Sequence, residues 1–219
     1  MSGGDQHRRD EEPAGLGPAA IARARAAALE ELRRQPRAVS WRRHAIGTVL
    51  AVLGTTALVL GLGSWFSIVE IERRSGRLAL VALLVALQGL GVYAAIAPGK
   101  NLLRRLVAVL AVTAAIAIVA TRGVGASSAT PAIACSGSHL AADLIPLGLV
   151  LFALRRFSWT LDRSLLAGAA AAATGAIAGE LSCARGWSHV LIHHVGAGLL
   201  IAIACVVISR MRRPHSFAP

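Results

Sequence analysis

The chain has 219 residues, of which 55% are hydrophobic and only 16% are charged, and its mean hydropathy is +0.62. A soluble domain of this length would distribute charge over its whole surface, whereas here the charged residues cluster between apolar runs of about 20 residues, the length that crosses a bilayer core. The formal net charge of +12 does not indicate a nucleic-acid-binding surface, because the arginines are concentrated at the ends of the apolar runs, where topology signals lie.

The first residues of the chain are polar, and a charged helix is expected after them. Residues 1–17 are interrupted by glycine and proline, so we expect them to be disordered. A helix is predicted over about residues 18–35, which consist mainly of the strong helix formers Ala, Leu, Arg and Glu. This helix could be a solvated segment ahead of the membrane, a docking helix for a cytoplasmic partner, or a helix lying on anionic lipid. Its candidate partner-binding face combines apolar side chains with flanking arginines: Ile21, Arg25, Leu29, Leu32 and Arg33.

Six apolar runs follow, and Trp41 beside two arginines marks the approach to the first of them. The sequence therefore predicts an all-α protein, a polytopic membrane bundle of six transmembrane helices over residues 44–213. A cytoplasmic N-terminal segment, 1–43, precedes the bundle, and a short cytoplasmic tail, 214–219, follows it. The expected spans are 45–69, 78–97, 100–120, 131–154, 164–181 and 189–209.

The distribution of arginine and lysine predicts the orientation. If both termini lie in the cytoplasm, the inner segments hold 18 of the 23 basic residues and the outer links hold five. Cytoplasmic segments of membrane proteins carry an excess of this kind. We therefore expect a multi-pass protein of a bacterial inner membrane with both termini inside.

Two polar clusters interrupt the apolar background, one near the start of the fourth span and one between the fifth and sixth. The fourth apolar run has only 15 residues when it is counted from Leu140, so the helix must begin earlier or carry the first cluster at its membrane mouth. The predicted topology places both clusters at or near the outer face, whereas Cys205 falls inside the sixth span. The clusters contain Cys135, His139, Asp143, Glu180, Cys183, His189, His193 and His194.

The cysteines of the two clusters are candidate sensing thiols. Cys135 and Cys183 would face an oxidising compartment, where a neighbouring pair can form a disulfide between the third–fourth and fifth–sixth hairpins. The alternative is that both are small buried residues without a chemical role. We interpret Cys205, which lies between Ala204 and Val206, as a packing residue.

The same clusters offer candidate metal ligands, since thiol, imidazole and carboxylate together suit zinc or copper. His189 and His193 are four residues apart, as are His139 and Asp143, so each pair shares a helix face. The alternatives are that the histidines only anchor helix ends, or that a haem is held between imidazoles such as His139 and His193. The candidate ligands are His139, Asp143, Glu180, Cys183, His189 and His193.

The remaining motifs argue against transport and catalysis. Asp143 and Glu180 lie either in the outer headgroup zone or deeper, paired with Arg185 or a protonated imidazole. The middles of the spans consist almost entirely of Ala, Leu, Val and Ile, which argues against a transport pathway. The chain has no serine-nucleophile motif, phosphate loop or Cys-x-x-Cys, so we expect that it is not an enzyme. Gly175 and Gly179 form a small-xxx-small pattern, which we interpret as packing within the bundle.

The order of these features resembles that of the NrsF-like membrane anti-sigma factors, which are negative regulators of extracytoplasmic-function sigma factors. The shared features are a short cytoplasmic segment with an arginine-containing approach, six spans, a cysteine opening the fourth span, an Arg-Arg pair after it, an Ala/Gly-rich fifth span, and a Leu-Ser-Cys ahead of a sixth span that bears Trp and His. The resemblance implies that Cys135 and Cys183 occupy the places of two outer cysteines associated with sensing. It also implies that the segment before Trp41 holds a sigma factor at the membrane.

The resemblance implies a sigma factor and membrane lipid as partners, without direct contact to nucleic acid. The histidine-rich sequence after Cys183 departs from the family and leaves open whether the signal is an oxidant or a metal. No cofactor is expected unless zinc or copper binds the outer His/Cys cluster. The alternatives are a membrane metal-binding or redox protein that uses this cluster, and a structural six-helix protein without a site.

Overall fold

The computed structural model describes residues 17–34, 41–65, 75–124, 132–157 and 160–211. The predictions made for residues 1–16, for the link at 66–74 and for the tail 214–219 lie outside the described residues. The chain divides into two units, Met1–Val39 and Ser40–Pro219, and the second contains the helices that are long enough to cross a membrane.

The N-terminal unit contributes one helix, α1 (Pro18–Arg34), in the region where the sequence predicts one. Ile21 is 56% exposed and Leu29 is 52% exposed, so two of the predicted partner-binding side chains lie at the helix surface. The side chains of residues 31–34, which include Leu32 and Arg33, lie outside the described part of the chain.

The second unit confirms the predicted fold class. All its described elements are helical, and six helices are long and apolar enough to cross a membrane, the last being built from three helical pieces in succession. The first begins at Trp41 rather than at residue 45, and Trp41 packs there against Tyr93, with ring centroids 5.8 Å apart. The elements are α2 (Trp41–Trp65), α3 (Ser75–Ile96), α4 (Asn101–Ala120), α5 (Ala132–Leu154), α6 (Leu161–Ser182), α7 (Trp187–His189), η1 (Val190–Val195) and α8 (Gly196–Met211).

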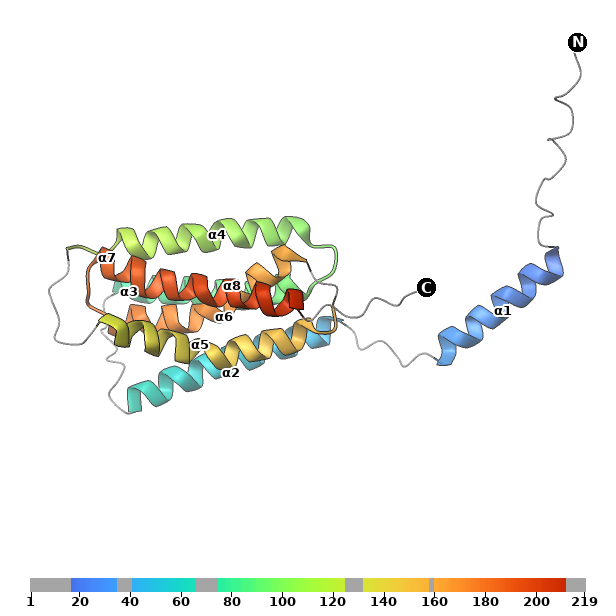
Figure 1. The fold of residues 1–219 in the computed structure, drawn as a ribbon, viewed down its shortest axis with the longest axis horizontal. Coiled ribbons are helices and arrows are strands. Elements are labelled where there is room, and N and C mark those ends of the chain that lie inside the picture. The colour runs from blue at the N-terminus through green and yellow to red at the C-terminus, as the bar shows by residue number, and fades with distance from the viewer. Residues whose placement is uncertain (1–16, 35–40, 66–74, 125–131, 158–159, 212–219) are drawn as a thin grey trace, which may run out of the picture. The chain divides into compact units, whose positions relative to one another are not determined.

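Helix α6 lies at the centre of the bundle, with α3, α5 and α8 packed against it (Figure 1). Of its hydrophobic stretch, 78% is buried, compared with 22% for α2 and for α4. The Ala/Gly-rich sequence of α6 explains this position, because small side chains allow neighbouring backbones to approach closely. A Cβ atom at Gly168 would lie only 2.6 Å from Ala202 Cα of α8, so this contact depends on glycine.

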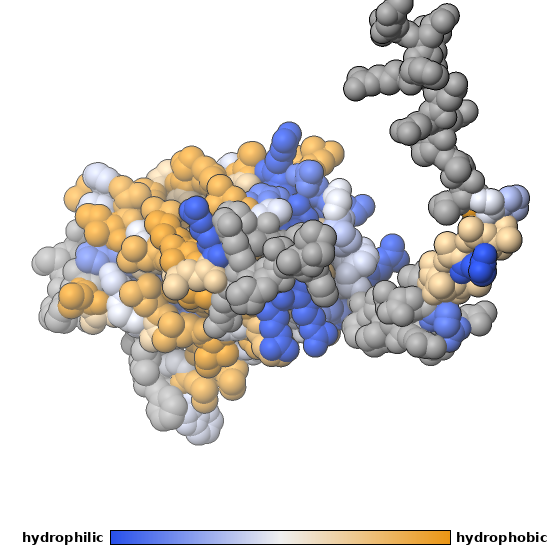
Figure 2. Space-filling view, turned by 45° about the vertical axis from the view of Figure 1, so that its right-hand side comes forward, coloured by the Kyte–Doolittle hydropathy of each residue, from blue (hydrophilic) through white to orange (hydrophobic). Residues whose placement is uncertain are grey.

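Hydrophilic side chains gather at one end of the bundle (Figure 2), and because the exposed ones include many arginines we call it the basic end. Arg104 is buried there; it donates hydrogen bonds to the carbonyl groups of Ala94 and Ala97 at the end of α3. It also forms an ion pair of 2.9 Å with Asp162 at the start of α6. Arg104 therefore ties α3, α4 and α6 together. The exposed basic residues of this end are Arg42, Arg43, Lys100, Arg105, Arg155, Arg156 and Arg210.

The middle of the bundle, which is almost entirely apolar as the sequence predicts, contains a small group of buried polar side chains. Gln88 of α3 donates to the carbonyl of Ala170 at 3.1 Å and to Thr174 Oγ1 at 2.9 Å. Thr56 Oγ1 of α2 lies 2.8 Å from Thr174 Oγ1, and all three polar side chains are buried. Single Gln and Thr residues carry little weight within a long apolar run, so the sequence pattern does not reveal that they meet. Their hydrogen bonds join α2, α3 and α6.

Candidate functional site

Both polar clusters of the sequence lie at the end of the bundle opposite the basic end (Figure 1). The first turns of α5 carry one cluster. The last turn of α6, its C-cap residue and the start of the final crossing carry the other. We call this end the thiol end; it comprises Cys135, His139, Asp143, Glu180, Cys183, His189, His193 and His194.

A π-helical turn decides which histidines share a face. Hydrogen bonds in η1 join residues five apart, instead of the four of an α-helix. His189 and His194, which are five apart, therefore come close, with ring centroids separated by 5.6 Å. His189 and His193, which the sequence already pairs, have centroids 4.6 Å apart. The π-turn thus adds His194, which α-helical spacing would place elsewhere.

Gly175 and Gly179 of α6 make room for two of the imidazoles. A Cβ atom at Gly175 would lie 2.6 Å from His139 Cγ, and one at Gly179 would lie 2.5 Å from His194 Cε1. Protein interiors are close-packed, so atoms cannot approach to these distances without displacing the rings. The small-xxx-small pattern therefore serves packing within the bundle, as predicted, but the space above the two glycines is filled by imidazole rings.

A buried carboxylate and two imidazoles form a connected row beside these glycines. Asp143 is fully buried, and its Oδ1 accepts the backbone N–H of Gly175 at 2.7 Å. Its Oδ2 lies 3.2 Å from His139 Nε2, and His139 Nδ1 lies 3.4 Å from His194 Nδ1. Both ring nitrogens of His139 therefore face other protein groups. This arrangement does not fit His139 as an axial ligand of the haem considered from the sequence.

Glu180 pairs with Arg122, not with Arg185 or an imidazole as the sequence suggests. Arg122 follows α4, and its guanidinium lies 2.8 Å from Glu180 Oε1. It also donates a hydrogen bond to the backbone carbonyl of Cys183. Both side chains are almost fully buried, with 5% of Arg122 and 3% of Glu180 exposed. Sequence reasoning treated Arg122 only as a topology signal, and its separation of 58 positions from Glu180 gives no local signal of the pair.

The structure brings Cys135 and Cys183 together. Cys183 caps the C-terminus of α6 and is buried, whereas Cys135 is half-buried in the first turn of α5. Their side chains lie near enough to interact, and both are free thiols. Cys205 is fully buried in the core of the bundle, where it packs close to Gly168.

The candidate metal ligands assemble differently from the set chosen by sequence. Three residues bring donor atoms to within 4.8 Å of one another: Cys135, His189 and His194. Two of these, Cys135 and His194, are absent from the predicted ligand set. The predicted ligand His193 instead contacts Ser136, with its Nδ1 2.8 Å from Ser136 Oγ. The other predicted ligands are placed as described above: His139 and Asp143 with each other, Glu180 with Arg122, and Cys183 beside Cys135.

An apolar cavity of about 290 Å³ extends from the thiol end toward the middle of the bundle. Arg122, Glu180 and His194 border one part of it, and leucines such as Leu84 and Leu87 border the rest. In so apolar a setting an unpaired charge is costly. Each charge of the Arg122–Glu180 pair therefore depends on the other for its compensation.

Comparison with known proteins identifies a relative. No protein-family model and no solved structure matches the chain. The chain is 37% identical over 207 residues to the carotenogenesis protein CarR of Myxococcus xanthus, and the alignment covers 92% of this chain and 91% of CarR. The alignment thus extends over nearly the full length of both proteins. The chain therefore belongs to the family of the carotenogenesis protein CarR.

Proposed function

We propose that the protein is a membrane-embedded, signal-transducing regulator, an anti-sigma factor that holds a sigma factor through its N-terminal segment and responds to chemistry at the thiol end. The observation that carries the proposal is the separation of two features along the bundle. The chain enters α2 at the basic end, whereas thiols and imidazoles gather at the opposite end. A chemical change on one side of a membrane can then alter what is held on the other.

The proposed orientation places the basic end in the cytoplasm of a bacterium and the thiol end outside its inner membrane. The exposed arginines and the lysine of the basic end support it, because basic residues are enriched on the cytoplasmic side. The thiols then face a compartment in which disulfides form and persist. Both termini are cytoplasmic in this orientation.

Helix α1 is the proposed holding element. It presents Ile21 and Leu29 at its surface, with Arg25 also exposed. A helix of this kind binds by placing its apolar side chains in a groove of the partner. The relative is named a carotenogenesis protein, so we propose that the sigma factor held by this chain directs genes of carotenoid synthesis.

The proposed signal path runs along α5. A peroxide oxidises Cys135 and Cys183 to a disulfide; the thiols lose two electrons and two protons, and the peroxide is reduced to water. The bond draws the sulfur atoms to about 2.05 Å and so draws α5 toward α6. Near its other end, α5 meets the helix that follows the N-terminal segment, because His44 Nε2 lies 3.3 Å from the Ala153 carbonyl. The sigma factor is released only if its affinity differs between the two packings.

Co-purification tests the holding function. The full-length chain, tagged at its C-terminus, is isolated from membranes of its native host, and bound proteins are identified by mass spectrometry. We expect a sigma factor, and we expect Leu29→Glu to reduce its recovery roughly tenfold, as for a lost apolar anchor. Ala27→Glu, on the opposite face of α1, is the matched control and should retain the sigma factor. Recovery of the parent chain without any sigma factor would show that the proposal is wrong.

A peroxide challenge of the same preparation tests the signal. The parent chain should release the sigma factor, whereas Cys135→Ser and Cys183→Ser should retain it. Cys205→Ser, whose thiol lies in the core, should release it like the parent. If the first two variants release the sigma factor as the parent does, the thiols have no sensing role and the structural alternative is favoured.

A further inference from the structure

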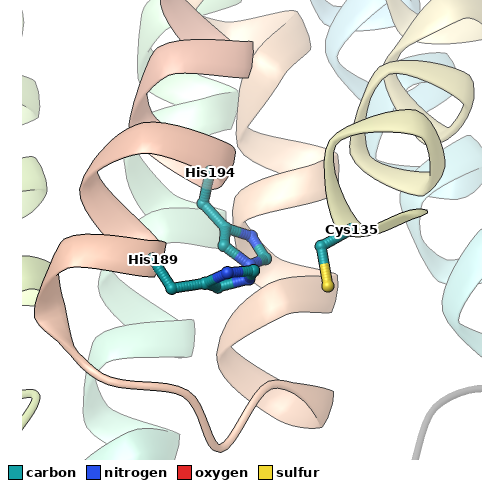
Figure 3. A group of neighbouring side chains, drawn as sticks. All are labelled: Cys135, His189 and His194. Atoms are coloured by element: carbon teal, nitrogen blue, oxygen red, sulfur yellow. The ribbon is translucent and has the colours of Figure 1, made fainter. Parts of the chain in front are cut away.

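Three metal-ligating side chains from separate elements converge at the thiol end (Figure 3). Cys135 lies on α5, His189 on α7 and His194 on η1, and one donor atom of each lies within 4.8 Å of the others. Metal–ligand bonds of about 2.0–2.3 Å at tetrahedral angles place neighbouring donor atoms roughly 3.3–3.8 Å apart. Side-chain movements of about 1 Å would therefore close the group around an ion.

A fourth donor lies next to this group. The Cys183 side chain interacts with that of Cys135, so a second thiol lies beside the three converging donors and would have to move toward them to complete the set. Two thiolates and two imidazoles form the standard tetrahedral zinc set, and the same soft donors also suit Cu⁺. The two thiolate charges would balance a divalent ion, which matters where a net charge is costly to bury.

Two imidazole nitrogens of the group have no other use among the described residues. His189 Nε2 and His194 Nε2 are buried and have no hydrogen-bond partner there. His194 as a whole is only 9% exposed. A buried polar atom without a partner is destabilising, and most buried polar atoms in folded proteins have a hydrogen-bond partner. A metal ion between the two rings would satisfy both nitrogens.

The surroundings of His194 have the form of a metal site's supporting shell. His194 Nδ1 lies 3.4 Å from His139 Nδ1 and can donate its hydrogen to it, and His139 Nε2 lies 3.2 Å from Asp143 Oδ2. This assignment leaves the lone pair on His194 Nε2. Metal-bound imidazoles typically donate their second N–H in this way, which fixes the tautomer and ring orientation. Arg185 lies 3.5 Å from His189 Nδ1. If His189 binds the metal through Nε2, its Nδ1 carries the hydrogen and cannot accept from the guanidinium, so Arg185 must turn away.

We propose that Cys135, His189 and His194, completed by Cys183, form a site for a thiophilic d¹⁰ cation, Zn²⁺ or Cu⁺. The site is inferred from the geometry alone, and only its consequence for regulation rests on the proposed function. A bound ion holds the two thiols in the reduced state and joins α5 to the final crossing. Its arrival or loss would then bias the helix packing that controls the sigma factor.

Metal binding to the purified full-length protein tests the proposal without reference to any sigma factor. The detergent-solubilised protein is titrated with Zn²⁺, with Cu⁺ under anaerobic conditions, and with Mg²⁺, and bound metal is measured by mass spectrometry after desalting. We expect one equivalent of Zn²⁺ or Cu⁺ and none of Mg²⁺; competition between the first two identifies the preferred ion. Co²⁺ should give the absorption bands of a tetrahedral thiolate complex. Failure to retain either soft ion would overturn the proposal.

Variants assign the ligands. Cys135→Ser and His194→Gln should weaken binding by roughly tenfold or more, and Asp143→Asn should weaken it through the supporting shell. His193→Gln is the matched control, because its ring contacts Ser136 and lies outside the group, and it should bind like the parent. Equal losses in His193→Gln and His194→Gln, or binding unaffected by Cys135→Ser, would contradict the ligand assignment.

Thiol protection in the unmodified chain gives a readout that does not depend on any variant folding. Bound metal should slow the alkylation of Cys135 and Cys183, and a chelator should restore it. Cys205, buried in the core, serves as the internal reference and should be unaffected by metal. Protection that is absent, or that extends equally to Cys205, would count against the site. If metal binds but no sigma factor co-purifies, the site stands and the proposed function fails.

Discussion

The buried ion pair between Arg122 and Glu180 yields the sharpest quantitative prediction. Both side chains are almost fully buried beside an apolar cavity, and the guanidinium also holds the backbone carbonyl of Cys183. Replacing Arg122 with methionine removes the charge and both contacts while keeping an unbranched side chain in place. The carboxylate of Glu180 is then left buried without its cation.

The expected cost follows from this burial. Removing one partner of a buried ion pair destabilises a protein by about 3–5 kcal/mol, whereas replacing both partners with apolar residues is often neutral. Arg122→Met and Glu180→Leu should therefore each lower the free energy of unfolding by about 3–5 kcal/mol. The double variant should be more stable than either single variant, which requires a coupling energy larger than the cost of either single change, about 3–5 kcal/mol.

Reversible unfolding in mixed detergent micelles, followed by circular dichroism, measures all four proteins of this cycle. Arg105→Met is the matched control, because Arg105 is exposed at the basic end, and it should change the unfolding free energy by less than about 0.5 kcal/mol. Additive costs in the double variant, or a loss below about 1 kcal/mol for Arg122→Met, would refute the claim that the charges depend on each other.

Three further predictions concern the interior and the basic end. Gly175→Ala should destabilise the bundle by about 1–3 kcal/mol in a thermal unfolding assay, because the added Cβ would collide with the His139 ring. Gly148→Ala is the control; its added Cβ meets open space, so the change should be neutral or stabilising. Gln88→Leu should cost only about 0.6–1.7 kcal/mol in the same assay, the range for interhelical hydrogen bonds in membranes. Arg104→Leu should cost more than Gln88→Leu, since the buried carbonyl groups of Ala94 and Ala97 then lose their donor. A smaller loss would show that this contact does not tie the helices together.

The sequence by itself determined the fold class and the outline of the bundle. Helix length and hydropathy are properties of contiguous residues, so six crossings and the position of α1 follow from local composition. The same reasoning placed Cys135 and Cys183 at one end of the bundle, because the number of intervening crossings decides on which side each lies. The Ala/Gly content of α6 likewise indicated close packing.

The tertiary structure alone decided which side chains meet. Arg122 reaches Glu180 because of how α4 and α6 are set against each other, and helix register and rotation leave no local trace in hydropathy. His194 joins His189 because a π-turn changes the residue spacing, whereas the sequence was read with α-helical spacing throughout. Gln88 was overlooked for the related reason that one polar residue barely alters the mean of a long apolar run. Local chemistry determines that this chain crosses a membrane; the site depends on contacts between helices, which only the packed bundle specifies.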